Sequence, residues 1–393
     1  MRTQWWLAEG SRADAPLAEV RRAVSTTSWL TVPHYEQVIN DLAAGRSLNR
    51  KNWHYEPAFF DRAHEKIREA AAQLHNLDHP AADLVHHYIQ QATHVVDTFT
   101  HVRTDKVHPA EANQTFTDWS STKFGLPEQS VIQEAYTLLE AHPASGVIRT
   151  TRRAKEAETA ASEELGQVVE RCQRLLDEVT TDWTVSVKPM LPDSVVSSAR
   201  KVVWLSQHLR DWPTPEVART LVHEIGTHAY RTINAQSASG TIAGVFLGPD
   251  AHLTQEGLAV WWEYRLGLGS VAARRYAARV VAVDIALHGS IYDVFNVLSR
   301  YLPSRLAATT ALRVKRGLAD PTLPGAYTKD HVYASGHRLV RSYIADHGEG
   351  VLPLLMSSKW GLSCLPLVEQ MHTDGMFEGA TRAMPTERLR NGL

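Results

Sequence analysis

The spacing of apolar residues changes character near Trp183, and this change limits what the chain can fold into. Over residues 57–77 and 81–102, apolar side chains recur at spacings of three and four, which predicts amphipathic helices. After Trp183 the pattern alternates with a period of two over 183–188, and residues 201–206 are β-branched and aromatic, which predicts short strands. The sequence therefore predicts an α+β fold that is predominantly helical, with a small sheet next to the helix that follows it.

The length of the chain and its lack of linkers favour one continuous structural unit. Its 393 residues, 44% of them hydrophobic, suffice for a large buried core, and we find no repeat and no Gly/Ser linker. We expect a helical region over 1–150 that forms part of a cleft, and a second region over 151–393 that carries the candidate site described below. A loop with Pro109 and Asn113 is expected between helices. Further helices are predicted at 116–124, 128–140 and 153–179.

Charge and cysteine content exclude several classes of protein. With 41 basic and 43 acidic residues the net charge is −2, so no overall field attracts nucleic acid or an anionic membrane. The two cysteines, Cys172 and Cys364, are too few for a disulfide framework or a thiolate zinc cluster. We find no apolar run long enough for a signal peptide or a membrane span. The sequence therefore predicts a cytoplasmic protein without nucleic-acid or membrane partners, and it predicts no particular oligomeric state.

Histidine is frequent in this chain, with 20 residues, but most of them are not expected to bind metal. His87, His94 and His101 recur every seventh residue along a predicted helix. Successive members lie ~10 Å apart along the helix axis, so they cannot share one ion. We expect these three side chains to be solvated or to line a groove.

Another predicted helix carries two histidines at an unusual spacing. It begins near Thr214, which we interpret as the N-cap, and it contains His223 and His228. Histidines four residues apart lie roughly 40° apart around a helix and reach one ion, whereas a spacing of five gives roughly 140° in a regular α-helix. A π-bulge accommodates one inserted residue, and Gly226 tolerates the irregular backbone. We therefore predict a π-type or overwound turn over 223–228 that restores both imidazoles to one side.

The third ligand is expected from a helix that follows the turn at 248–250. Glu256 is expected in the first turn of this helix, where the helix dipole favours a carboxylate. Gly257 allows a partner helix to approach closely. Glu263 is a fallback ligand, although a solvated or salt-bridged role fits it better. Together these residues predict a metal centre of His223, His228 and Glu256, and the alternative is a structural helix with incidental histidines.

The predicted ligand set also indicates the chemistry. Three protein ligands leave one coordination position open, as in catalytic rather than structural zinc sites, so we expect Zn²⁺ with water in that position. Glu224, next to the first ligand, is the predicted general base. It takes the proton of the attacking water and later donates it to the leaving amine.

Two motifs carry a resemblance to a known family. His223–His228 (HEIGTH) and Gln255–Ala259 (QEGLA) resemble the QEGLA-motif family described as modulating flavohaemoglobin expression, whose eukaryotic relatives are the microtubule-associated tyrosine carboxypeptidases. The resemblance implies a zinc carboxypeptidase of mixed α and β structure that removes a C-terminal residue, often tyrosine, from a peptide or protein. It implies the same three zinc ligands, with Glu224 as the catalytic glutamate. Further resembling fragments are 116–127, 313–317, 325–330 and 333–336.

A carboxypeptidase must bind a terminal carboxylate, and a positioned cation is the usual solution. For each candidate cation the alternative is a structural salt bridge or a solvated position. Tyr333 is a candidate donor to the oxyanion, with a core tyrosine as the alternative. Asn234 is a candidate for binding substrate backbone, with a helix-terminating asparagine as the alternative. Trp261 and Trp262 are expected to pack in the core. The candidate cations are Arg231, Lys329, Arg313 and Arg316.

The leading hypothesis is hydrolysis of a C-terminal peptide bond of a peptide or protein. Two alternatives stay open. One is a zinc-dependent amide or ester hydrolase that acts on a small molecule or natural-product precursor, and the other is a regulatory zinc protein without turnover. A peptide amidated at its C-terminus separates the two hydrolases, because only the carboxypeptidase needs the free carboxylate.

Overall fold

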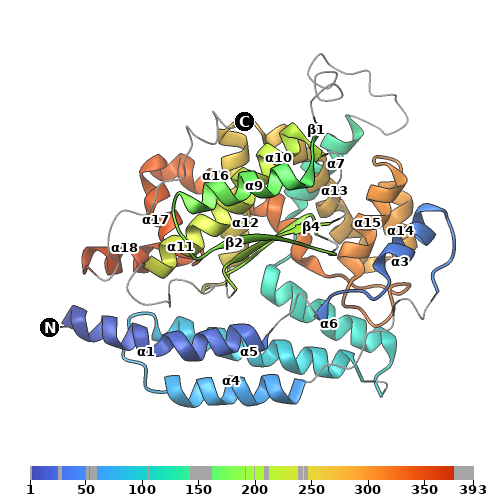
Figure 1. Cartoon of the computed structure of the whole chain (residues 1–393). Helices are drawn as coiled ribbons and strands as arrows, with labels where there is room; N and C mark the ends of the chain where they lie inside the picture. The colour runs from blue at the N-terminus through green and yellow to red at the C-terminus, as the bar shows by residue number, and fades with distance from the viewer. Residues whose placement is uncertain are drawn as a thin grey trace.

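The structure is a computed structural model in which the chain is mostly helical, with a small three-stranded sheet and a separate two-stranded pair (Figure 1). It describes residues 2–24, 29–49, 53, 60–104, 106–141, 162–190, 192–198, 200–207, 212–237, 242 and 247–375. Over these residues the predicted fold class is confirmed: α+β, predominantly helical, with the sheet beside the histidine-bearing helix.

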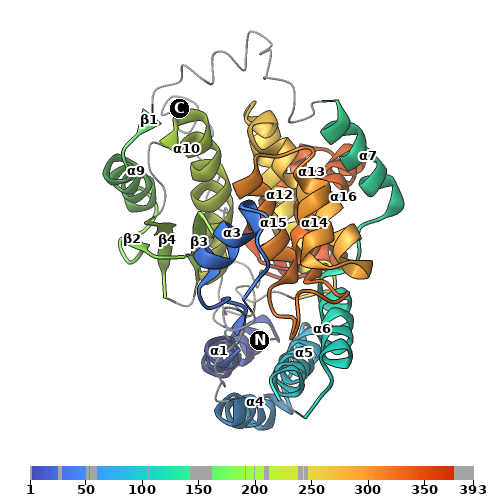
Figure 2. The same cartoon turned by 90° about the vertical axis from the view of Figure 1, so that its right-hand side faces the viewer.

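Four helices form a layer at one end of the molecule (Figures 1 and 2). They are α1 (Arg2–Ala23), α4 (Phe60–Leu74), α5 (Ala82–Val102) and α6 (Pro109–Phe124), and each contacts the next in this order. The amphipathic helices predicted over 57–77 and 81–102 are confirmed as α4 and α5. His87 and His94 are exposed on α5 and His101 is half-buried, in line with the solvated positions expected for them.

The loop expected around Pro109 and Asn113 is wrong, because α6 already begins at Pro109. Proline suits the first helical position, since its missing N–H would have no partner there. The side chain of His108 caps the helix by accepting a backbone hydrogen bond. Asn113 is buried and donates to the carbonyl oxygens of Asp320 and Pro324. This one amide therefore ties the N-terminal layer to the C-terminal half of the chain.

The sheet consists of β2 (Thr184–Lys188), β3 (Ser194–Ser197) and β4 (Val202–Ser206), in the order β2-β4-β3. Strand β2 runs parallel to β4, and β3 runs antiparallel to it. The strands predicted at 183–188 and 201–206 are confirmed, whereas β3 was not predicted. Because β3 is at the edge of the sheet and contacts the histidine-bearing helix, the missed strand is the one nearest the candidate site.

The helix predicted over 153–179 is shorter in the structure. It is confirmed as α9 (Leu165–Asp177), and residues 153–161 lie outside the described part of the chain. Helix α9 begins with a capping box between Glu164 and Gln167, which satisfies backbone N–H groups at its start. A two-residue antiparallel pair, β1 (Ser162–Glu163) with β5 (Trp212–Pro213), lies just before the histidine-bearing helix.

The histidine-bearing helix is a continuous run of three segments: α10 (Thr214–Thr220), the π-helix η2 (Leu221–Ala229) and α11 (Tyr230–Ser237). It packs on α12 (Ala251–Arg265), which in turn crosses α16 (Val332–His347). Gly257 and Gly336 meet at this crossing. A Cβ atom at 257 would lie 2.8 Å from Cα of Gly336, and one at 336 would lie 3.0 Å from N of Gly257. The close helix approach predicted for Gly257 is therefore confirmed.

A second group of helices packs beside this crossing (Figure 2). Helix α13 (Gly269–His288) contacts α7 (Gln129–Glu140), and α15 (Ser304–Lys315) contacts α3 (Tyr35–Ala43), so parts of the first 150 residues pack against the C-terminal half. Both cysteines are buried, and neither forms a disulfide. The remaining elements are α14 (Ile291–Leu298), η4 (Thr328–His331), η5 (Glu349–Val351), α17 (Leu352–Ser357), η6 (Leu362–Cys364) and α18 (Leu365–Thr373).

Among the described helices, none is by itself both long and apolar enough to cross a membrane. One sharply bent pair, Glu349–Ser357 with Leu362–Thr373, meets the length and composition requirements only when the two helices are taken together.

Candidate metal centre

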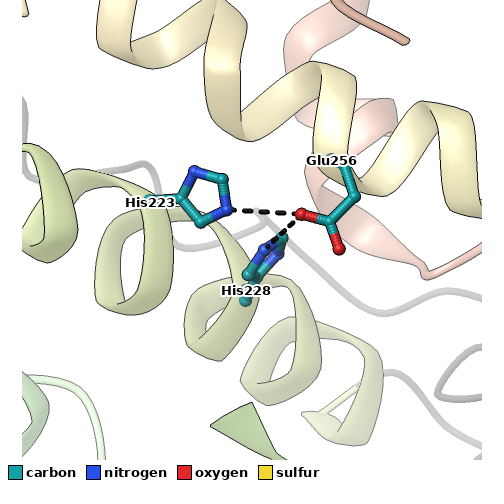
Figure 3. A group of neighbouring side chains, drawn as sticks. All are labelled: His223, His228 and Glu256. Carbon is teal, nitrogen blue, oxygen red and sulfur yellow. Dashed lines mark hydrogen bonds and ion pairs between the residues drawn. The ribbon is translucent and has the colours of Figure 1, made fainter. Parts of the chain in front are cut away.

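The π-helix η2 brings His223 and His228 to the same side of the helix. Their Nε2 atoms lie 3.3 and 3.4 Å from Oε2 of Glu256, and the candidate ligand atoms of the three residues all lie within 4.8 Å of one another (Figure 3). In a π-helix the hydrogen bonds join residues five apart, so a spacing of five returns to nearly the same face. The π-type turn predicted over 223–228 is confirmed, and it extends over Leu221–Ala229.

Two predicted helix starts need correction. The N-cap of α10 is Pro213, which makes no side-chain capping bond, and Thr214 is already helical. Helix α12 begins at Ala251, so Glu256 lies in its second turn rather than its first. The helix dipole therefore stabilises the Glu256 carboxylate less than expected, because its effect falls off beyond the first turn. The position of Glu256 depends instead on the crossing of α12 with α16.

Glu263 holds His223 from the side opposite Glu256. Its Oε1 lies 2.7 Å from Nδ1 of His223, and it accepts hydrogen bonds from Arg219 at 3.1 Å and Tyr276 at 2.9 Å. The Glu263 side chain is 0% exposed. A carboxylate on Nδ1 fixes the orientation of the imidazole and leaves Nε2 to bind a metal. The salt-bridged role expected for Glu263 is confirmed, and its fallback role as a ligand is not supported.

The charges around His223 suit a bound cation. Burial opposes the positive charge on His223, but hydrogen bonds with Glu256 and Glu263 outweigh it and raise the pKa of this histidine to about 9. Burial also opposes the charge on Glu256, yet His228 and His223 keep its pKa well below the usual range. Two buried carboxylates thus stay ionised on either side of one imidazole. Such a group of donors attracts positive charge to the point where the three ligand atoms converge.

Gln255 and Arg231 support His228 from behind. The amide nitrogen of Gln255 lies 2.5 Å from Nδ1 of His228, and Arg231 donates to the amide oxygen at 2.6 Å. Arg231 also donates to the carbonyl oxygen of Trp360. It is 0% exposed and is not among the residues that line the pocket. The expectation that Arg231 contacts substrate is therefore corrected, because the protein itself surrounds this guanidinium.

Asn234 also lies away from the pocket. It is buried, and its amide donates to the carbonyl oxygen of Met356 at 3.1 Å. Because this contact joins α11 to α17, the expected contact of Asn234 with substrate backbone is corrected to a structural one. Trp261 and Trp262 are buried outside the pocket lining, as expected for packing residues.

The candidate ligands open onto a pocket of about 560 Å³. Its walls include Arg21, Tyr88 and Lys123 from the N-terminal layer, and residues 192–198 around β3. Glu224 faces this pocket, and the hydroxyl of Ser194 donates to its Oε1 at 2.7 Å. Ser194 was missed in the sequence because it belongs to β3, which has no clear alternating pattern.

Three of the predicted substrate-binding cations line the pocket. The Nζ atom of Lys329 lies 3.8 Å from Oε1 of Glu256. Arg313 makes a two-point ion pair with Asp330 at 2.7 and 2.9 Å, and Arg316 lies 3.7 Å from the same carboxylate. Burial raises the pKa of Asp330, but the arginines around it outweigh burial and hold that pKa well below the usual range. Lys329 therefore lies beside the candidate ligand Glu256, whereas the other two cations share a buried aspartate.

Tyr333 lies next to the metal centre, as its predicted role requires. Its ring centroid is 6.0 Å from that of His223, and it lines the pocket. Burial raises the pKa of Tyr333 well above its ordinary value. The phenol therefore stays protonated and is able to donate a hydrogen bond.

Fold and site together define a class of protein. It is a mostly helical α+β protein in which two histidines of a π-helix and a glutamate of a neighbouring helix converge beside a pocket. A family model described as "Microtubule-associated tyrosine carboxypeptidase" matches residues 50–391, and the chain belongs to this family. The resemblance seen in the two motifs is thereby confirmed.

Two relatives give the extent of the similarity. Microtubule-associated tyrosine carboxypeptidase 1 of Homo sapiens is 35% identical over 150 residues, which is 35% of this chain and 29% of the human protein. The protein of the same name from Rattus norvegicus is 34% identical over 126 residues, which is 30% of this chain and 25% of the rat protein. The chain thus spans less than a third of the length of these relatives.

Proposed function

We propose that this chain is a zinc-dependent carboxypeptidase that hydrolyses the last peptide bond of a peptide or protein. The observation that carries the proposal is the convergence of His223, His228 and Glu256 beside the pocket-facing carboxylate of Glu224. Family membership supports the choice of bond, because the relatives are named as tyrosine carboxypeptidases.

The donor set fits a catalytic zinc ion. Two imidazoles and one carboxylate form a common ligand set of zinc peptidases, and among the described residues the cluster contains three such groups. Three ligands favour an enzyme over a regulatory zinc protein, whose structural site would need four. When bound, Zn²⁺ lowers the pKa of a water molecule and polarises the carbonyl of the substrate.

Glu224 is the proposed proton carrier. Its carboxylate faces the pocket beside His223, and Ser194 fixes one of its two oxygens. Glu224 takes a proton from the attacking water and delivers it to the amine of the residue that leaves. Because Glu224 is not one of the three ligands, its carboxylate can be removed without loss of the metal.

Tyr333 and Lys329 are proposed to stabilise the carbonyl oxygen as negative charge develops on it. The Tyr333 ring stacks on that of Tyr276 at a centroid distance of 5.2 Å, which holds it in place. The ammonium of Lys329 is 3.8 Å from an oxygen of Glu256, one of the three residues that would hold the metal. A fixed phenol and a fixed ammonium reach the carbonyl oxygen of the substrate without reorganisation, which lowers the barrier.

Metal analysis combined with mass spectrometry of peptides with varied C-termini tests the proposal. We expect zinc to copurify with the protein and peptides to lose their last residue. Glu224→Gln should lower kcat/KM by roughly 10²- to 10⁴-fold while the zinc content stays unchanged. Glu349→Gln is the matched control, because that carboxylate is exposed and outside the pocket. Full activity in Glu224→Gln, or a wild-type protein that binds no metal, contradicts the proposal.

A further inference from the structure

Three arginines of the pocket wall gather around one buried carboxylate, that of Asp330. Arg313 and Arg316 both lie against Asp330, at 2.7 and 3.7 Å. Arg279, on α13, lines the same pocket and is close enough to sense the charges of Asp330 and Arg313. Within the described part of the chain, however, Arg279 makes no hydrogen bond and no ion pair. Two of the three guanidinium groups thus pair with one aspartate, and the third, that of Arg279, lies beside them in a partly buried region without an ion pair of its own to a described residue.

Arg279 is held by stacking rather than by an ion pair. Its guanidinium carbon lies 4.6 Å from the ring centroid of Tyr333 and 5.7 Å from that of Tyr276. These two rings are almost parallel, with an interplanar angle of 5°. A cation–π contact with a ring uses none of the N–H donors of the guanidinium in a hydrogen bond to oxygen, so these donors are left for a planar anion. Burial lowers the pKa of Arg279 and Arg313 lowers it further, and Tyr333 and Asp330 offset these effects only in part.

The position of Arg279 relative to the metal ligands suits a terminal carboxylate. Tyr333, on which Arg279 stacks, is also the ring that lies 6.0 Å from His223. The carboxylate of a C-terminal residue follows the scissile carbonyl by one residue, or roughly 3.6 Å of chain. The ammonium of Lys329 is 3.8 Å from an oxygen of the candidate ligand Glu256. This distance leaves no room for a whole residue between the scissile carbonyl and the ammonium. Arg279 contacts the aromatic ring that neighbours His223 and makes no ion pair with Glu256, so it leaves this room.

We propose that Arg279 binds the terminal carboxylate of the residue that is released, through the nitrogens at the edge of its guanidinium. This inference rests on the proposed carboxypeptidase function and explains how cleavage is restricted to the end of a chain. Arg313 is less suited to the role, because Asp330 already occupies two of its donors. The rival is Lys123, another pocket cation that forms no ion pair with a described residue, packed over the ring of Trp119.

Paired peptides that end in a free carboxylate or in a carboxamide test the inference. Arg279→Met should lower kcat/KM for the free acid by roughly 10²- to 10³-fold and leave the slow cleavage of the amide unchanged. Arg279→Lys should recover part of the loss, because it keeps the charge without the planar fork. Arg274→Met, on the same helix but outside the pocket, is the matched control and should behave as wild type.

Three outcomes overturn the inference while the proposed function stands. In the first, Arg279→Met lowers acid and amide cleavage equally. In the second, it leaves both unchanged. In the third, Lys123→Met abolishes the preference for the acid while Arg279→Met keeps it, which assigns the carboxylate to Lys123.

Calorimetry separates this inference from the proposed function. A short peptide acid should bind the Glu224→Gln protein at least about 10-fold more tightly than its amide, and Arg279→Met in that background should remove the difference. This result supports the inference even if the wild-type protein cleaves no peptide, in which case only the proposed function fails. Equal binding of acid and amide by the Glu224→Gln protein overturns it.

Discussion

Replacement of Gly257 by alanine perturbs the contact that sets the distance between Glu256 and Tyr333. Gly257 follows Glu256 directly on α12, and Gly336 lies three residues after Tyr333 on α16. A Cβ atom at 257 would lie 2.8 Å from Cα of Gly336, with the carbonyl atoms of Gly336 nearer still. Ordinary contacts between carbon atoms are ~3.5–4.0 Å. The two helices must therefore separate by about 1 Å where they cross.

The expected cost of this separation has two parts. Overpacking costs about 1–3 kcal/mol, which for a chain of 393 residues lowers the melting temperature by roughly 1–4 °C. A shift of about 1 Å also exceeds the tolerance of ~0.5 Å for a preorganised site. We therefore expect Gly257→Ala to weaken zinc binding by about 10- to 100-fold, as loss of an outer-shell partner does. Scanning calorimetry measures the first effect, and zinc titration against a competing chelator measures the second.

Gly166→Ala is the matched control for this experiment. A Cβ atom at Gly166, in the first turn of α9, meets no atom within 4 Å. Alanine also has the higher helix propensity, by about 1 kcal/mol in a helix interior. The control should keep its zinc affinity and keep or raise its melting temperature. If Gly257→Ala binds zinc as tightly as wild type and melts at the same temperature, the reasoning that the crossing positions Glu256 is refuted.

Two further predictions concern other buried groups. Glu263→Gln should weaken zinc binding by about 10- to 100-fold, because it removes the carboxylate charge next to Nδ1 of His223. A variant that binds zinc with wild-type affinity in the same chelator titration would contradict this. Burial lowers the pKa of His79 in the folded protein to about 4, from the 6.5 that this histidine has in the unfolded chain. As the pH falls, His79 therefore takes up its proton in the unfolded chain before it does so in the folded protein. Stability should therefore be lost between pH 6.5 and 4, by about 2 kcal/mol at pH 5. His79→Asn keeps an acceptor for the N–H of Ala81, and the loss of unfolding free energy at low pH should disappear in this variant when it is measured by urea unfolding. An equal loss in the variant and in the wild type would show that His79 does not cause it.

The histidine-bearing helix could be predicted because the information that defines it is local. Two histidines, a glutamate and a glycine within six residues determine both the π-helix and the side on which the imidazoles lie. Glu256 could be assigned from its own motif, although its helix begins earlier than expected. The start at Ala251 was missed because Asp250, its N-cap, makes no side-chain capping bond that would mark it.

The groups around the ligands could not be predicted, because they come from elements far apart in the sequence. Glu263 was noted as a carboxylate, but its bonds to Arg219 and Tyr276 depend on how α10, α12 and α13 pack. Arg279 lies in a long helix whose sequence reads as ordinary core and surface positions. Only the packing of α13 against η4 and α16 brings its guanidinium over Tyr333.

The two irregular features of the fold lie in the two elements that supply the candidate ligands. The π-helix replaces regular hydrogen bonding over nine residues of a buried helix, and a glycine in the middle of α12 costs about 1 kcal/mol in helix propensity. Such departures from local preference persist where they serve a site and are compensated elsewhere. Here the first aligns two imidazoles and the second lets α16 approach, so that Tyr333 reaches His223. A histidine spacing of five and a glycine after the glutamate are therefore two parts of one geometry, and a search confined to histidines four residues apart would miss it.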